Sequence, residues 1–208
     1  MIVFFNWFAK ITGLPGAFVC FRTKHLYEDR SVQSRRIKGP AIIVSNHTSV
    51  IDYVVMLFVF FSRTLRYQMA EVLFTRKFLA PLLRMLGGIY VDRDSTNLGF
   101  MSESARILKK GGVVGIFPEG RLPRPGETPP IEFKPGAAYL ALSTGVKLIP
   151  VYTDGSYFNL KKRAHVVIGT PIDPKGFDDP SRNDKENIEA LTAAMREKII
   201  KLGAMLDG

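Results

Sequence analysis

The sequence predicts an α/β fold for most of the chain. From Gly39 onward, short apolar runs alternate with longer stretches in which apolar residues recur at helical spacing. The 208 residues are 46% hydrophobic, which is enough to bury one full core, and a charged fraction of 23% does not suit a disordered chain. We therefore expect one α/β domain over residues 39–208, preceded by an N-terminal segment of different character over residues 1–38.

The N-terminal segment has the pattern of a membrane-associating element. Residues 1–21 are rich in large apolar side chains, but Lys10, Pro15 and two glycines interrupt them. Neither half reaches the roughly 20 uninterrupted apolar residues that a spanning helix needs. Trp7 lies among phenylalanines, and a collar of basic residues follows. This collar comprises Arg22, Lys24, Arg30, Arg35, Arg36 and Lys38. We predict that the segment lies in the headgroup layer of a membrane, with a helix packed into the protein core as the alternative.

The remaining elements are predicted in chain order from apolar periodicity. Five short apolar runs indicate buried strands at 41–45, 89–91, 113–117, 148–152 and 164–168. Helices are expected between and after them at 50–61, 75–86, 96–109, 136–144 and 184–206. The Pro- and Gly-rich stretch at 122–132 is predicted to be a functional or edge loop.

The composition limits the classes of partner. A net charge of +10, from 29 basic and 19 acidic residues, favours a polyanion such as nucleic acid, an anionic membrane or a phosphorylated substrate. Fifteen Phe and seven Met favour the membrane surface among these partners. Proteins that bind single-stranded nucleic acid alternate aromatic and basic residues, and this sequence lacks that pattern, so no nucleic-acid partner is expected. One cysteine excludes a disulfide scaffold and a thiolate metal site, which indicates a cytosolic bulk domain.

The first chemical motif is Asn46-His47-Thr48-Ser49-Val50-Ile51-Asp52, directly after the first predicted strand of the domain. With His47 in the loop and Thr48 or Ser49 capping the next helix, Asp52 can fold back toward the imidazole. The carboxylate would fix the ring tautomer and leave the other nitrogen free as a base. A capping histidine beside a helix N-terminal charge is the structural alternative.

Two further motifs end predicted strands, where ligands gather in open α/β folds, and a third precedes the helix predicted at 136–144. Phe117-Pro118-Glu119-Gly120-Arg121 offers a carboxylate, a glycine for close backbone approach and a forked cation, with a turn that carries a surface ion pair as the alternative. Arg93 could clamp a phosphate monoester or form a structural ion pair. Phe133-Lys134-Pro135-Gly136 is interpreted mainly as structural, because Pro135 suits the first position of a helix, and Lys134 could also be a charge partner for the ligand.

Together these blocks resemble the glycerolipid acyltransferases, specifically the bacterial 1-acyl-sn-glycerol-3-phosphate acyltransferases. NHTSVID, GGIYVDR, FPEGR and KLIPVY match the four signature blocks of that family in order, over about residues 40 to 152. The resemblance implies the glycerol-phosphate acyltransferase fold, with a central mixed sheet flanked by helices. It also implies transfer of a fatty acyl group from acyl-CoA or acyl carrier protein to the sn-2 hydroxyl of a lysophosphatidate, giving phosphatidate for phospholipid biosynthesis.

The resemblance also assigns roles to residues. His47 would be the general base and Asp52 its orienting partner; Arg93 would bind the acceptor phosphate. Glu119 and Gly120 would shape the acceptor site, with Arg121 assisting. No metal or cofactor is implied, because a thioester is already activated for attack by a hydroxyl.

Some expectations stay open. The family often continues FPEG with Thr-Arg-Ser, whereas this chain continues with Arg121-Leu122-Pro123-Arg124, so either Arg121 or Arg124 could meet the phosphate. The acceptor could also be glycerol-3-phosphate or another lysophospholipid, and a non-catalytic membrane-binding module is a further alternative. We expect the protein at the cell membrane, peripheral or monotopic on the cytoplasmic face, with an anionic lipid surface and possibly acyl carrier protein as partners.

Overall fold

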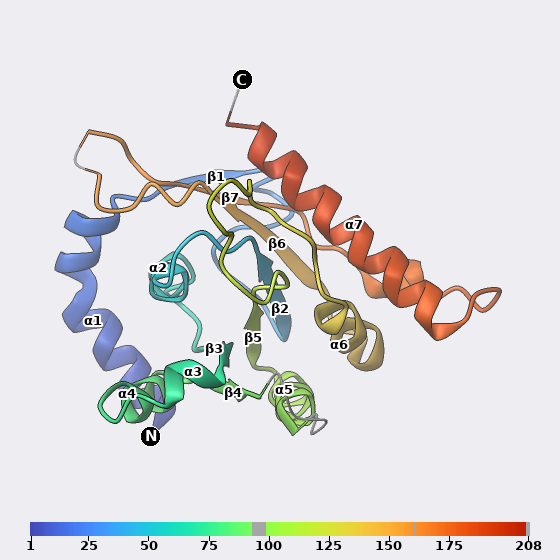
Figure 1. Cartoon of the computed structure of the whole chain (residues 1–208), viewed down its shortest axis with the longest axis horizontal. Coiled ribbons are helices and arrows are strands. Elements are labelled where there is room, and N and C mark those ends of the chain that lie inside the picture. Colours follow the sequence, from blue (N-terminus) through green and yellow to red (C-terminus); the bar gives the residue numbers. More distant parts are fainter. Residues whose placement is uncertain (93–98, 160, 207–208) are drawn as a thin grey trace.

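The structure, a computed structural model, describes residues 1–92, 99–159 and 161–206 (Figure 1). Within these residues seven strands form one sheet in the order β1-β7-β6-β2-β5-β3-β4. The strands are β1 (Lys24–Tyr27), β2 (Ala41–Ser45), β3 (Leu65–Ala70), β4 (Ile89–Val91), β5 (Val113–Ile116), β6 (Leu148–Thr153) and β7 (His165–Ile168). All neighbours are parallel except β6 and β7, so the sheet is mixed, as predicted.

Helices cover both faces of the sheet (Figure 1). One side carries α1 (Ile2–Phe21), α2 (Asp52–Val59), α3 (Glu71–Phe74) and α4 (Leu79–Leu86), and the other carries α5 (Gly99–Lys109), α6 (Gly136–Thr144) and α7 (Asp184–Ala204). A short 3-10 turn, η1 (Pro174–Phe177), precedes α7. Successive side chains of β2 alternate between the two apolar clusters: Ile43 joins the one under α2, and Ile42 and Val44 join the one under α6 and α7.

Two strands were not predicted, and each has a physical reason. In β3, Leu65, Tyr67 and Met69 are buried while Arg66, Gln68 and Ala70 are partly exposed, so the strand lacks a continuous apolar run. In β1 no residue is fully buried. Because β1 pairs with β7, the sheet includes part of the 1–38 segment. The helix expected at 75–86 is wrong in extent: α4 begins at Leu79, and the separate turn α3 ends at Phe74.

The expectation that Pro15 and its neighbouring glycines divide the N-terminal segment is also wrong. Residues 2–21 form one helix, α1, which is long and apolar enough to cross a membrane by length and composition. Two of its polar side chains, Asn6 and Lys10, point inward. Asn6 Nδ2 donates to the carbonyl of Leu86 (3.0 Å), and Lys10 Nζ donates to the carbonyl of Phe61 (3.1 Å), with both side chains fully buried.

The outward face of α1 is mainly apolar. Its exposed large apolar side chains are Val3, Phe4, Phe8, Ile11, Leu14, Phe18 and Val19. A soluble surface helix has the opposite arrangement, with its apolar stripe toward the core and polar residues outside. The buried amide and ammonium groups hold α1 against α4 and the end of α2 through backbone carbonyls, while the large apolar side chains stay outside.

Candidate active site

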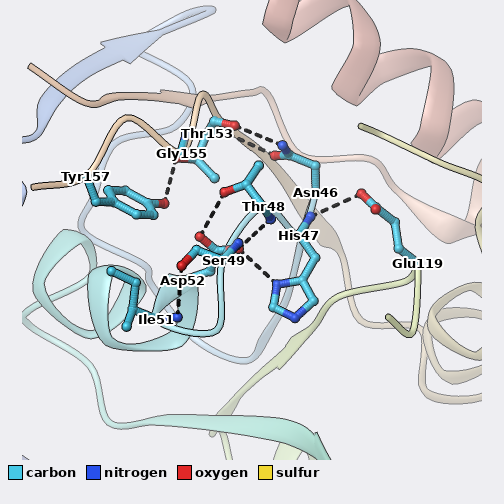
Figure 2. A network of polar contacts seen from close by, with 10 residues as sticks. All are labelled: Asn46, His47, Thr48, Ser49, Ile51, Asp52, Glu119, Thr153, Gly155 and Tyr157. Carbon is cyan, nitrogen blue, oxygen red and sulfur yellow. Dashed lines mark hydrogen bonds and ion pairs between the residues drawn. The ribbon is translucent and has the colours of Figure 1, made fainter. Parts of the chain in front are cut away.

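The site is built where β2 and β6 end side by side (Figure 2). Asn46, the residue after β2, donates through Nδ2 to the carbonyl of Thr153 (2.8 Å) and accepts through Oδ1 from the Thr153 amide (2.9 Å). Both residues are fully buried, so neither hydrogen bond competes with water. This clasp fixes the backbone immediately before His47.

Asp52 folds back onto the loop that precedes its own helix. It is the first residue of α2 and fully buried, and its Oδ2 accepts the amides of Thr48 (2.7 Å) and Ser49 (2.9 Å). The Thr48 hydroxyl donates to Oδ1 (3.1 Å). The prediction that Thr48 or Ser49 caps the helix is wrong, because Ile51 occupies the N-cap position without a side-chain cap. The carboxylate instead ties the loop to the helix N-terminus, where the helix dipole favours its charge.

The same carboxylate oxygen lies 2.9 Å from His47 Nδ1, so the contact predicted from the five-residue spacing is present. Because a carboxylate only accepts, the imidazole carries its proton on Nδ1 and leaves Nε2 with a lone pair. Figure 2 shows the second ring nitrogen pointing away from Asp52. The side chain of His47 is 18% exposed, so a substrate can reach the imidazole ring.

An aromatic stack supports the imidazole from the sheet side. The rings of His47 and Phe117 are 4.2 Å apart and nearly parallel, and Phe117 lies 4.9 Å from Tyr67. Tyr67 is fully buried beneath them, over Gly115 of β5. A Cβ at Gly115 would come within 2.1 Å of the Tyr67 ring, so only glycine leaves room for this stack.

Glu119 approaches the histidine from the neighbouring strand end. Its Oε1 accepts the amide of His47 (3.1 Å), and the residue is 2% exposed. Burial raises the pKa of the Glu119 carboxyl above its ordinary value, opposed by the hydrogen bond from the His47 amide. The structure therefore brings together His47, Asp52 and Glu119, which the sequence placed in two separate motifs.

The basic candidates are distributed differently from expectation. Arg121 forms a forked pair with Glu127 (2.6 and 2.8 Å), and the hydrogen bond from Arg121 lowers the pKa of Glu127 to about 2. Arg121 is therefore engaged within its own loop. Lys134 lies over Gly120, where the φ angle is +70° and a Cβ would stand 3.3 Å from Nζ. Arg93 lies outside the described residues.

Sequence reasoning missed the residues that hold the motif in place. Thr153 and the Tyr157 hydroxyl, 2.8 Å from Thr153 Oγ1, complete the network drawn in Figure 2. The one available signal was their position just after the IPVY block, at the end of a buried strand. In the described part of the chain, no group of three or more His, Cys, Asp or Glu side chains could hold a metal ion.

Comparisons with known proteins identify the family of this chain. The sequence profile of the family described as Acyltransferase matches residues 22–154. The 1-acyl-sn-glycerol-3-phosphate acyltransferase of Bacillus subtilis is 27% identical over 80% of this chain and 82% of its own length. The human 1-acyl-sn-glycerol-3-phosphate acyltransferase beta is 33% identical over 66% of this chain, and the match spans half of the human protein.

A solved structure supports the fold. The crystal structure of the 1-acyl-sn-glycerophosphate acyltransferase PlsC from Thermotoga maritima superimposes with a TM-score of 0.62, covering 98% of this chain and 80% of that one. The sequence identity is 23%. The mixed sheet flanked by helices and the apolar N-terminal helix thus match the predicted fold class.

Proposed function

Because the chain belongs to the acyltransferase family, we propose that it transfers a fatty acyl group from a thioester to the sn-2 hydroxyl of 1-acyl-sn-glycerol-3-phosphate, giving phosphatidate. Relatives from bacteria and mammals that carry this activity in their names support the acceptor. The observation that carries the chemistry is the His47 and Asp52 pair, with one ring nitrogen held by a buried carboxylate and the other directed away from it.

The reaction follows from the geometry of this pair. Nε2 of His47 accepts the proton of the acceptor hydroxyl as its oxygen attacks the thioester carbonyl. The tetrahedral intermediate collapses with loss of the thiolate, which takes the proton back from the imidazolium. Asp52 stabilises the imidazolium between the two proton transfers, and no covalent enzyme intermediate, metal or cofactor is needed. Positive charge for the acceptor phosphate comes from Lys134 and Arg93. Arg121 adds to it if its guanidinium leaves Glu127 and binds the phosphate. The acceptor site itself is shaped by Glu119 and Gly120.

The purified protein tests this proposal directly. It is incubated with palmitoyl-CoA or palmitoyl carrier protein and with lysophosphatidate, glycerol-3-phosphate or lysophosphatidylcholine, and the products are identified by mass spectrometry. Phosphatidate should be the dominant product, and His47→Ala should lower its rate of formation by about 100-fold or more without changing the melting temperature. Dominant acylation of another acceptor, or turnover retained in the variant, contradicts the proposal.

We also propose that the outward face of α1 lies in the headgroup layer of the cytoplasmic membrane surface, as a peripheral or monotopic anchor. The support is its row of exposed apolar side chains, with the buried Lys10 and Asn6 on the opposite face. The basic excess of the chain suits anionic lipid.

Flotation with anionic phospholipid vesicles tests the anchor. Replacing Phe4 and Phe18, 75% exposed each, with serine should lower the partition coefficient roughly 100-fold, since each lost phenylalanine costs about 1.5 kcal/mol or more. Val32→Ser, at an exposed apolar residue outside α1, is the matched control and should float like the wild type. If the double variant floats like the wild type, α1 does not contact the membrane.

A further inference from the structure

A second charged site lies near the candidate active site. A cavity of about 870 Å³ opens between the starts of β1 and β7, the end of β6, the carboxyl end of α7 and the Pro129-Pro130 turn. The residues that line it include Lys24, Lys162, Arg163 and His165. The sequence analysis placed Lys24 in the basic collar of the N-terminal segment and gave Lys162, Arg163 and His165 no role.

Strand directions place this cavity at the same edge of the sheet as His47. Strand β7 runs antiparallel to β6, so it begins where β6 ends, and β1 begins beside it with Lys24 opposite His165. Strands β6 and β2 run parallel and end together. Only two strand spacings, roughly 10 Å, separate the β7 start from the β2 end. Asp154 of the cavity directly follows Thr153, which clasps Asn46.

The cavity carries an excess of positive charge. Its one described acidic side chain, Asp154, is committed within the turn: Oδ2 lies 2.9 Å from His165 Nδ1, and Oδ1 accepts the amides of Ser156 (3.0 Å) and His165 (3.1 Å). No ion pair of Lys24, Lys162 or Arg163 is found among the described residues. Ammonium and guanidinium groups without acidic partners are ready to bind phosphate.

Most of the remaining lining is apolar. Leu26, Pro129, Pro130, Tyr152 and Leu206 contribute to the walls. Cations beside aromatic and aliphatic faces are the combination that binds a phosphorylated nucleotide, because the base packs on the apolar wall while the phosphates meet the cations. A lipid headgroup has the phosphate without the base and would leave these walls uncovered.

We propose that this cavity binds the phosphorylated adenosine end of an acyl-coenzyme A donor. The assignment rests on the proposed acyl transfer and makes acyl-CoA the donor. The pantetheine arm then reaches from the cavity along the sheet edge to His47, and the cations hold the diphosphate and the ribose phosphate. An acyl carrier protein carries the same pantetheine arm on its own surface and has no adenosine end, so it would leave the cavity empty.

Donor kinetics of a double variant test the assignment. Lys24→Ala with Lys162→Ala removes two cavity cations outside the catalytic network, and Lys109→Ala with Lys110→Ala removes the same charge at the carboxyl end of α5, the opposite edge of the sheet. The cavity variant should raise the KM for palmitoyl-CoA about tenfold, equal to about 1.4 kcal/mol. Its KM for lysophosphatidate and its rate with palmitoyl-N-acetylcysteamine, a thioester without phosphates, should match the control.

Equilibrium titration separates this proposal from the acyl transfer itself. Adenosine 3′,5′-bisphosphate should bind the wild-type protein and the control variant, and it should bind the cavity variant about tenfold more weakly. This binding does not depend on turnover, so it can succeed even if no acceptor is acylated. Equal binding by all three proteins, a KM change for lysophosphatidate instead of palmitoyl-CoA, or a change seen only with palmitoyl carrier protein would overturn the assignment.

Discussion

The charge of Asp52 should matter more to the rate than to the fold. Asp52→Asn keeps the size of the side chain, and its amide oxygen can still accept the Thr48 and Ser49 amides and His47 Nδ1 in the place of Oδ2. The Thr48 hydroxyl can turn to accept from the new NH2 group. The hydrogen-bond network is thus preserved, and the negative charge beside the imidazole is lost.

The magnitude follows from the distance. Nδ1 and Oδ2 are 2.9 Å apart, which puts the centres of the two charges about 4 Å apart when His47 is protonated. At an effective dielectric constant of about 20, that attraction is about 4 kcal/mol. Since the imidazolium forms as Nε2 takes the hydroxyl proton, the loss falls on the barrier, and kcat/KM should drop roughly 10³-fold.

The assay measures phosphatidate formation and thermal unfolding on the same preparations. Asp52→Asn should melt near the wild type, whereas Asp52→Ala should melt clearly lower, because two buried amides lose their acceptor at about 1–3 kcal/mol each. The double variant His47→Ala with Asp52→Asn should be no slower than His47→Ala alone, because the two residues act as one unit. If Asp52→Asn keeps its rate within about tenfold at an unchanged melting temperature, the electrostatic role is refuted.

Two further predictions concern the support of the site and the response to pH. Gly155, at φ +68°, is close to Thr48, and the Cβ of Gly155→Ala would lie 2.5 Å from Thr48 Oγ1, so we expect kcat to fall. Gly145→Ala is the matched control, because Gly145 has a similar φ of +65° but nothing within 4 Å of its added Cβ, and its kcat should stay well above that of Gly155→Ala. Equal kcat values for the two variants would show that the Thr48 contact is unimportant. Burial, with Arg35 and Arg163 nearby, lowers the pKa of His25 to about 4. The unfolded chain therefore binds the extra proton between pH 6.5 and about 4, and the free energy of unfolding should decrease by about 1–2 kcal/mol, after screening, as the pH falls through that range. Chemical denaturation of His25→Gln should show a flatter pH profile, and a slope identical to that of the wild type would argue against this source.

The layered architecture was accessible from the sequence because it depends on local patterns. The apolar stripe of α7 at Leu191, Met195 and Ile199 is fully buried, as its spacing predicts. The five predicted strands all exist. Four of them, β2, β5, β6 and β7, are mostly buried and so are continuous apolar runs, whereas in the short β4 only Ile89 is buried. The strands that were missed, β1 and β3, are short or alternate with polar residues, and their neighbours in the sheet determine them.

The candidate site divides in the same way. The sequence by itself determined that His47 and Asp52 could meet, because both lie within one loop and helix start and five residues allow the return. Only the tertiary structure decided what surrounds them. Thr153 is 107 residues from the Asn46 that it clasps, and Glu119 reaches the amide of His47 across 72 residues.

Charge and polarity depended on tertiary structure most of all. The sequence gives the number of basic residues but not their contacts. In the folded chain Arg121 pairs with Glu127, whereas Lys24 and Lys162 line a cavity. It also turned Lys10 inward onto backbone carbonyls, so that the apolar side chains of α1 face outward. Composition states which charges exist, whereas the partners that neutralise them come from distant segments, and packing alone brings those segments together.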